Sequence, residues 1–389
     1  MSTSREIQDL DSTQLASELF DAHGLTRFLS RLSNGDTQRH ILFFLLFYAP
    51  LPIIVIASSY FEGTLWLESV NGGKGLFEHF GSLSNMLLMP VIYFLYIHYV
   101  YLIAKMLKDI LYRSNIAGKN SKSQNDSLIQ SKVMPILLCK NIEHRVIKYL
   151  FVLLGIYSLV INSGQTTDSL HFYGNDVWDS YTYIFGYVAG RLLLFVQWVI
   201  ILPFVAYTLF ACCYAVTLIA QKISNNSFLV ISPFAPDGCG GVGSLGQVML
   251  ASTYFLTPIY LIVVAHYFTH ENIYLTLILA SVFLVLVSIG ILLLPFLRLH
   301  GHLSEWKESS LSRLEHKLCD YLDIQAEEGL SGEVHVKALA LEKVYSHVQT
   351  LRTWPYSLGD QLKWASTVLG IIVAWTPKIL AYVMNGRAG

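Results

Sequence analysis

The stretch ILFFLLFYAPLPIIVIASSYF occupies residues 41–61 and contains no charged side chain. About 20 consecutive apolar residues are enough to cross the hydrocarbon core of a bilayer as an α-helix. A helix is favoured there because it satisfies its own backbone hydrogen bonds, which lipid cannot do. Pro50 and Pro52 interrupt the backbone ladder and predict a kink. The stretch therefore predicts a transmembrane helix and an all-α fold.

The composition of the whole chain supports the same interpretation. The chain has 389 residues, of which 53% are hydrophobic and 14% charged, and its mean hydropathy is +0.49. Soluble globular domains carry about 25% charged residues, so this composition excludes an ordinary soluble domain. Further segments of suitable length and hydropathy are 83–104, 147–162, 183–220, 248–268, 273–297 and 362–383. We expect an all-α polytopic transmembrane helical bundle of about six to seven spans with a cytoplasmic helical hairpin.

The distribution of charge orients these spans. Residues 105–148 contain nine Lys or Arg and three acidic residues, whereas residues 162–183 contain three Asp and no Lys or Arg. Positively charged loops stay in the cytoplasm, which puts the N-terminus and the basic loop inside and the acidic loop outside. The expected parts are an amphipathic cytoplasmic segment (1–40), two spans (41–104), a basic cytoplasmic loop (105–147), four spans with a glycine-rich turn at 233–246 (148–297), a cytoplasmic helical hairpin (298–361) and a C-terminal hydrophobic helix (362–389).

Two of the parts outside the spans have helical periodicity. Apolar residues recur at three- and four-residue spacing in residues 15–32. This segment is expected either to lie on the membrane surface or to pack on the protein itself. In residues 298–361, Gly329 and Gly332 separate two apolar stripes, which predict a pair of antiparallel helices. One hairpin cannot bury both stripes completely, and this favours contacts between subunits.

The segment PFAPDGCGGVGSLG, residues 233–246, is the most distinctive local sequence and directly precedes a predicted span. It formally contains GxGxxG, but a dinucleotide site needs a preceding strand and a βαβ unit. Either the glycines form a tight turn with positive φ and close packing, or their backbone N–H groups bind an anion or gate a pathway. Asp237 is expected to cap the following helix or to pair with a cation. The candidate residues are Asp237, Gly238, Gly240, Gly241, Gly243 and Gly246.

Together with Trp354-Pro355-Tyr356, this segment resembles a pattern in uncharacterised bacterial polytopic inner-membrane proteins. In those proteins a PDxxGGLGxLG-like segment precedes a membrane helix, and a WPF-like tripeptide precedes a C-terminal hydrophobic stretch. The likeness covers roughly residues 230–385, with Val242 in place of Leu and Tyr356 in place of Phe. The resemblance implies a multi-pass protein of the bacterial inner membrane and brings no activity with it.

Arg191 is a candidate because it is an ionisable residue within a predicted span. It follows Gly186 and Gly190, whose four-residue spacing lets another helix approach closely. We expect its guanidinium either to find a carboxylate or carbonyl partner inside the protein or to extend to the outer headgroups.

Histidines and lysines supply the remaining candidates. His266 and His270 are spaced as HxxxH without the glutamate of HExxH. They are expected to be interfacial, with metal binding or a proton relay as the weaker alternatives. Four lysines of the basic loop either fix the topology or attract an anionic ligand. They are Lys119, Lys122, Lys132 and Lys140.

We considered three classes of function for these features: a carrier, an enzyme and a pore. A carrier predicts inverted repeats and midplane charge, and an enzyme predicts convergent acids or nucleophiles; neither pattern stands out. The hypothesis is an oligomeric inner-membrane pore or channel-like effector, gated from the cytoplasm, non-enzymatic and without a cofactor. A secondary transporter of a small solute, a membrane-embedded enzyme and a scaffold stay open as alternatives.

The same hypothesis names partners. They are the lipid bilayer, further copies of the chain, and a cytoplasmic activator protein or an anionic nucleotide. By analogy of architecture alone, effectors of this kind occur in bacterial antiviral defence.

The charge asymmetry generates the first prediction. Single cysteines placed at Ser121 and Thr167, after replacement of the five native cysteines, should react with a membrane-impermeant maleimide from opposite sides of sealed vesicles. The reason is that the basic and acidic loops lie on opposite sides of the bilayer. Labelling of both positions from the same side would contradict this topology.

Overall fold

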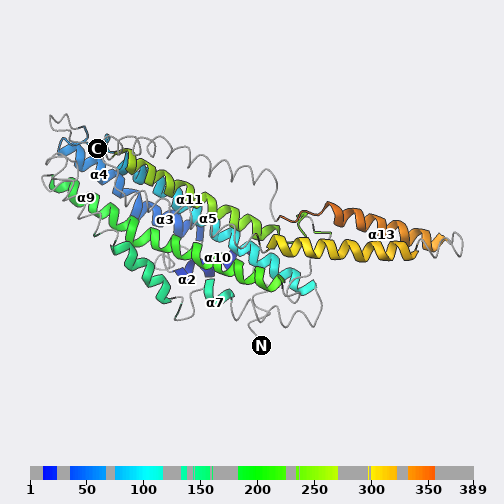
Figure 1. Ribbon diagram of the computed structural model, residues 1–389. Helices are drawn as coiled ribbons and strands as arrows, with labels where there is room; N and C mark the ends of the chain where they lie inside the picture. The colour runs from blue at the N-terminus through cyan, green and yellow to red at the C-terminus, as the bar shows by residue number, and fades with distance from the viewer. Residues whose placement is uncertain are drawn as a thin grey trace, which may run out of the picture.

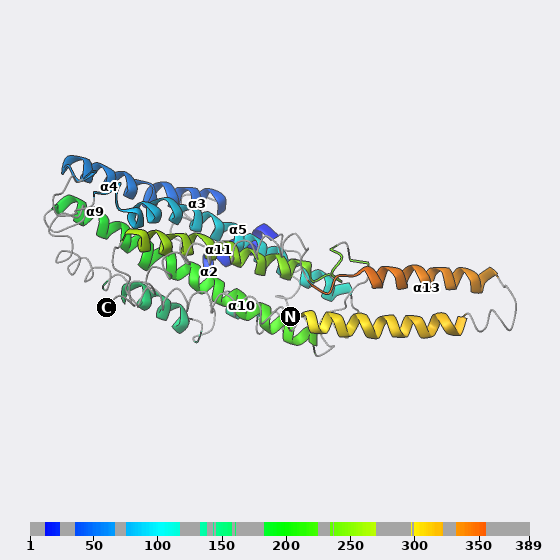
Figure 2. The ribbon, with the colours of Figure 1, turned by 45° about the horizontal axis from the view of Figure 1, so that its top comes forward.

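The structure is a computed structural model. It describes residues 12–23, 36–66, 75–116, 133–137, 143, 145–157, 160, 183–224, 234–235, 237–269, 297, 299–321 and 332–354. Within these ranges the regular secondary structure is helical and no strand is present, so the predicted all-α class is confirmed for them. Figures 1 and 2 show a long bundle of helices with a pair of helices projecting from one end.

The helices follow one another along the chain without intervening strands in the ranges described. In chain order they are α2 (Ser12–His23), α3 (Asp36–Phe43), η2 (Phe44–Tyr48), α4 (Pro50–Phe61), α5 (Phe80–Ile116), α7 (Met134–Leu137), α9 (Ile184–Phe195), η4 (Val196–Ile201), α10 (Leu202–Ser224), α11 (Gly243–Thr269) and α13 (Gly332–Thr350). Residues 145–157 and 299–321 are also helical.

Among the described residues, three stretches are long and apolar enough to cross a membrane. They are Gln38–Phe61, Ser82–Ile110 and Ile184–Ile219, and they match the predicted spans 41–61, 83–104 and 183–220. Only 22% of the most apolar part of the first stretch is buried within the protein. Its remaining apolar surface therefore suits contact with lipid, which is what the sequence predicted for a transmembrane helix.

The other predicted spans are described in part. Segment 248–268 lies within α11, and most of segment 147–162 is helical. Gly155 in that helix lies so close to the backbone of Trp198 that a Cβ atom would collide with it, so the helix packs tightly against η4. Segment 362–383, and segment 273–297 apart from its last residue, lie outside the described residues.

Two of the spanning stretches contain a π-helical turn directly before a proline. In η2, the N–H of Ala49 donates to the carbonyl of Phe44 at 2.8 Å, just before Pro50. In η4, the N–H of Leu202 likewise donates to a carbonyl five residues back, just before Pro203. Proline has no N–H to donate to the carbonyl four residues back. Beside it, the helical hydrogen bonds change from carbonyls four residues back to carbonyls five residues back. A π turn therefore precedes each of these two prolines.

α5 is the central helix of the bundle and packs along α11 and against α2 (Figure 1). Its buried residues recur every three or four positions, as expected for a helix with one face in the core. They are Met86, Met89, Ile92, Tyr93, Tyr96, Tyr99, Val100, Ile103, Ala104, Met106, Leu107 and Ile110.

The end of α5 differs from the sequence-based expectation. The sequence predicted a span ending at Ala104 and a basic loop from residue 105, but the helix continues to Ile116. Met106, Leu107 and Ile110 continue the buried stripe, and this packing extends the helix through the basic residues beside them.

The N-terminal helix α2 packs on the protein, which is the second of the two arrangements left open by the sequence. Leu15, Ala16, Leu19 and Phe20 are buried. The Phe20 ring meets Tyr96 of α5 edge-on, with 6.1 Å between ring centroids. These contacts bring α2 against the middle of α5.

Residues 299–321 and α13 form the projecting pair and lie side by side in both views (Figures 1 and 2). Leu311, Leu314 and Leu318 of the first predicted stripe are half-buried, and Val348 of the second is buried. Other apolar residues of the pair stay exposed, among them Val336 and Leu339.

The N-terminus of α9 is capped by a carboxylate from the end of α4. Both oxygens of Glu62 accept backbone hydrogen bonds at 2.8 Å, one from Phe185 and one from Gly186. The first N–H groups of a helix have no partner within it, and a carboxylate there also interacts favourably with the helix dipole. This contact joins α4 to α9 across more than a hundred residues of sequence.

This contact generates the second prediction. Glu62→Ala should lower the stability of the purified protein by about 1 kcal/mol, because two helix N–H groups lose their acceptor. The measurement is thermal unfolding in detergent. Glu18→Ala changes an exposed glutamate of α2 and serves as the control. Equal melting temperatures of the two variants would show that the cap contributes nothing.

Candidate functional site

The carboxylate of Asp237 organises the glycine-rich turn. Its Oδ1 accepts hydrogen bonds from the N–H groups of Cys239 at 3.0 Å and Gly241 at 2.9 Å. Its Oδ2 accepts one from Gly243 at 2.8 Å, the first residue of α11. Three backbone donors thus converge on one carboxylate at a helix N-terminus. The helix-capping role expected of Asp237 is present, and the chain's own carboxylate occupies the place where the sequence allowed an external anion.

The turn needs glycine at particular positions. Gly238, Gly240 and Gly241 have φ angles of +62°, +67° and +99°, which L-residues with a Cβ atom adopt at a cost. At Gly243 a Cβ atom would lie 3.0 Å from a carboxylate oxygen of Asp237, so a larger residue there would require the carboxylate to shift. Gly246 follows in the first turn of α11. The tight-turn interpretation of the sequence therefore describes the geometry of this loop.

The chain beyond α13 returns to the glycine-rich turn. The backbone N–H of Arg352 donates to the carbonyl of Gly238 at 2.9 Å, and its guanidinium donates to the carbonyl of Asp237 at 3.2 Å. The thiol of Cys239 donates to the carbonyl of Trp354 at 3.3 Å. The glycine-rich segment and the start of the WPY tripeptide, far apart in sequence, thus meet in space.

Burial raises the pKa of the Cys239 thiol; the nearby Arg352 guanidinium lowers the pKa and the Asp237 carboxylate raises it. The raised pKa keeps the thiol protonated at neutral pH. A protonated thiol can donate the hydrogen bond to the Trp354 carbonyl, so this cysteine acts as a structural contact.

The base of the helix at 299–321 completes the assembly. Lys307 donates to the carbonyl of Leu351 at 2.8 Å. The ring of His300 stacks on Trp354, with centroids 4.3 Å apart and planes inclined by 13°. Its Nδ1 also lies 3.3 Å from the carbonyl of Thr353. We call the contact region of residues 237–243, 299–307 and 351–354 the hairpin junction.

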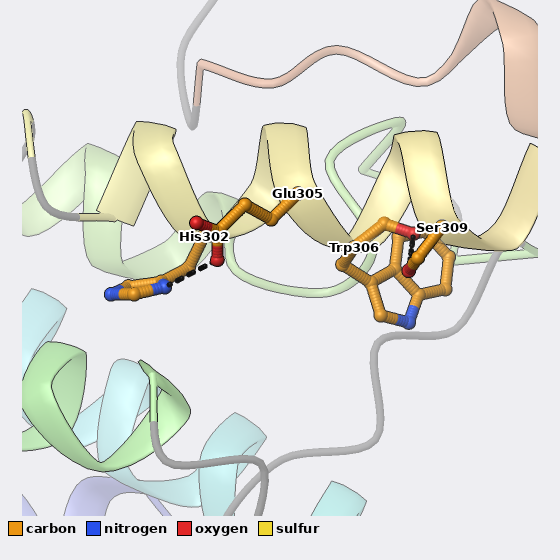
Figure 3. A network of polar contacts seen from close by, with 4 residues as sticks. All are labelled: His302, Glu305, Trp306 and Ser309. Atoms are coloured by element: carbon orange, nitrogen blue, oxygen red, sulfur yellow. Dashed lines mark hydrogen bonds and ion pairs between the residues drawn. The ribbon is translucent and has the colours of Figure 1, made fainter.

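The same helix carries two local polar contacts (Figure 3). His302 Nδ1 lies 3.6 Å from a carboxylate oxygen of Glu305, and the Ser309 hydroxyl donates to the carbonyl of Trp306 at 3.0 Å. The Trp306 side chain packs against the hydrophobic core and borders a small open pocket of about 10 Å³, which is room for about one water molecule. The pocket is lined by Cys239, Gly240, Leu303, Trp306, Lys307, Leu351, Arg352 and Thr353.

A second polar site lies inside the bundle, where the two π-helical turns meet. Nε2 of Gln197 in η4 lies 3.4 Å from both the hydroxyl of Tyr48 in η2 and the carbonyl of Asn85 in α5. The Tyr48 hydroxyl donates to the carbonyl of Met86 at 3.2 Å. We call Tyr48, Asn85, Gln197 and the Met86 carbonyl the inner polar cluster.

Further polar side chains follow the buried face of α5. Nδ1 of His40 lies 2.7 Å from the hydroxyl of Tyr93, and the hydroxyl of Tyr99 lies 2.9 Å from that of Ser252 in α11. All four side chains are buried. Buried polar residues in a membrane helix face the protein interior or a hydrated cavity, so this face of α5 is the more polar side of the bundle.

The other sequence candidates fall in different places. Arg191 lies on α9 beside the buried Gly186 and Gly190, and its guanidinium carbon is 5.0 Å from the centroid of the Tyr187 ring, a cation–π contact. Its expected carboxylate or carbonyl partner stays a prediction. His266 lies on α11.

Five of the predicted candidates lie outside the described residues. They are Lys119, Lys122, Lys132, Lys140 and His270. Within the described residues, no group of three or more His, Cys, Asp or Glu side chains is arranged to hold a metal ion.

Sequence reasoning did not single out Tyr48, Gln197, Lys307 or Arg352. The sequence predicted a kink at Pro50, and this could have drawn attention to Tyr48 just before it. The two cations of the hairpin junction offered no such signal, because charged residues are frequent in that part of the chain.

Comparisons with known proteins supply no family. No protein-family model, curated protein or solved structure matches the chain. The function is therefore inferred from the hairpin junction and the inner polar cluster.

The turn geometry generates the third prediction. Gly241→Val should destabilise the protein by about 1–3 kcal/mol, because a β-branched residue is strained at φ +99°. Gly301→Ala is the matched control, since a Cβ atom at this helical glycine meets no atom within 4 Å. The control should be neutral or slightly stabilising. Thermal unfolding in detergent and the yield of folded protein would measure both. A Gly241→Val protein as stable as the control would mean that the turn has another conformation.

Proposed function

We propose that this chain is an oligomeric membrane pore of the bacterial inner membrane, regulated from its projecting hairpin on the cytoplasmic side. The observation that carries the proposal is the hairpin junction. The segment after α13 is hydrogen-bonded to the loop that begins α11 through Arg352, and to the helix at 299–321 through Lys307. α11 in turn packs along the polar face of α5.

Through this connection, a movement of the hairpin is transmitted to the helices of the bundle. A displacement of residues 351–354 acts on the carbonyls of Asp237 and Gly238, and the Asp237 carboxylate holds the first turn of α11. A shift of α11 along α5 alters the contact between Tyr99 and Ser252. Packed helices have discrete arrangements rather than a continuum, so such a shift is suited to switching a path between two states.

The surface of the hairpin is suited to binding another protein. Val336 and Leu339 of α13 are 65% and 45% exposed, and the outer part of the apolar stripe is only half-buried. Exposed apolar residues on a projecting helix favour contact with another protein. The partners proposed for it are further copies of the chain and a cytoplasmic activator protein. An anionic nucleotide, drawn by the basic loop, and a role in antiviral defence belong to the same proposal.

A secondary transporter is the second candidate, and one observation favours it. Transporters bind substrates where membrane helices are interrupted near the bilayer midplane. Here the interrupted turns η2 and η4 meet at the inner polar cluster, and Tyr48 lies close to the middle of the stretch Gln38–Phe61. A transporter would give saturable counterflow of its solute, whereas a pore gives flux proportional to the gradient.

The fourth prediction tests the pore. The full chain, reconstituted in vesicles of mixed zwitterionic and anionic lipids, should conduct Na⁺ or K⁺ above the level of empty vesicles. Arg352→Ala removes a junction contact and should change this flux by about fivefold or more, the lower end of typical coupling between sites. Arg313→Ala changes an exposed arginine of the helix at 299–321 and should leave the flux unaltered.

Two outcomes would contradict the proposal. One is a wild-type protein and an Arg352→Ala variant that both conduct no better than empty vesicles. The other is a strictly monomeric particle, measured by native mass spectrometry from the same membrane preparation, because the proposal requires an oligomer.

A further inference from the structure

The central helix α5 begins at a histidine cap. His79 directly precedes the helix, and Ser82 is the third residue within it. Nδ1 of His79 lies 3.1 Å from the backbone nitrogen of Ser82 and 2.9 Å from the Ser82 hydroxyl. This is the N-cap arrangement, in which a side chain accepts the N–H of the second or third helical residue. Serine, threonine, aspartate and asparagine are the preferred caps, and of the five types only histidine changes its charge near neutral pH.

The hydrogen bond from Ser82 determines the protonation state of the imidazole. A backbone N–H can only donate, so Nδ1 of His79 must accept with its lone pair, and the neutral ring carries its proton on Nε2. An imidazolium ring carries protons on both nitrogens and offers no acceptor. Its Nδ1–H could donate to the Ser82 hydroxyl, whose role is reversible. The backbone N–H of Ser82 cannot reverse its role and would lose the cap.

Protonation of His79 also places a positive charge at the N-terminus of α5, where the helix dipole disfavours it. Two described carboxylates belong to the surrounding segments. Glu78 is the adjacent residue, and its Oε2 accepts from the N–H of Gly75 at 2.7 Å. Glu62, at the end of α4, accepts the first N–H groups of α9. Residues 64–66, which pair with residues 76 and 77, contain no titratable side chain.

The cap lies next to the part of α5 that contacts other spans. Asn85 and Met86 follow about one turn later and belong to the inner polar cluster, so opening of the first turn acts on that cluster. The N–H of Leu76 donates to the carbonyl of Thr64 at 2.9 Å, which ties the cap segment to the end of α4. α4 lies at the end of the bundle opposite the projecting hairpin (Figures 1 and 2). With the predicted topology, this end faces the outside.

We propose that His79 is a pH-sensitive cap, which holds the first turn of α5 closed at neutral pH and releases it in acid. Histidine in an unfolded chain takes up its proton near pH 6.5. Because the folded helix binds the neutral form, the stabilisation by the cap is present above that pH and is lost as the pH falls below it. The inference goes beyond the proposed pore, since it concerns the end of the bundle away from the hairpin and does not depend on conduction.

Hydrogen–deuterium exchange of the full chain in detergent tests the cap. The protection factor of the Ser82 amide, corrected for intrinsic exchange rates, should be about fivefold lower at about pH 5.5 than at about pH 7.5. His79→Asn supplies a cap that does not titrate and should keep the protection at both pH values. His79→Ala should lose it at both. His335→Asn changes an exposed histidine of α13 and should behave as the wild type does.

The outcomes separate this inference from the pore. Equal protection of the wild type at both pH values would overturn the pH-sensitive cap, even if the protein conducts. So would a loss of protection in acid that persists in His79→Asn. If His79→Ala does not fold, the wild type and His79→Asn decide, because both keep a cap at neutral pH. A loss in acid that is confined to the wild type and His335→Asn, in a protein that does not conduct, would retain the cap and remove the pore.

Discussion

The arrangement of the bundle depends on one constraint: backbone polar groups inside a membrane must find partners within the protein. Helices meet this requirement until a proline interrupts them. Just before Pro50 and Pro203 the helix forms a π turn, in which backbone N–H groups donate to carbonyls five residues back. At Pro90 the side chain of Tyr48 takes over the released carbonyl of Met86. The inner polar cluster therefore lies where prolines interrupt these helices.

The same requirement explains the ends of the helices. Glu62 provides acceptors for the first N–H groups of α9, and Asp237 does so for the turn that opens α11. Each carboxylate comes from a segment outside the helix it caps, so capping also joins elements together. At Asp237 this has a further effect, because Arg352 binds the carbonyls of the same turn. The glycine-rich turn is therefore a structural connection between the bundle and the hairpin as well as a helix cap.

Much of the fold could be predicted from the sequence, because apolar length and helical spacing are local properties. The apolar length of residues 41–61 and 183–220 is enough to predict their helices. The glycines at 238, 240 and 241 likewise predict a turn with positive φ angles. Contacts between distant residues could not be predicted. Nothing in the local pattern pairs Gln197 with Tyr48 or Arg352 with Gly238, since the partners are separated by more than a hundred residues. The extension of α5 to Ile116 was missed for a related reason: charged residues suggested a loop, whereas buried Met106 and Leu107 extend the helix.

The projecting hairpin also has a mechanical consequence. α13 has 19 residues, which at 1.5 Å per residue is a rod about 28 Å long. It is clamped at one end, where Leu351 and Arg352 meet Lys307 and the glycine-rich turn. A rod held in this way acts as a lever with its fulcrum at the clamp. Tilting it by about 10° moves its tip by about 5 Å, while atoms beside the fulcrum move by less than about 1 Å. A weak force at the tip therefore becomes a much larger force, over a short distance, on the first turn of α11.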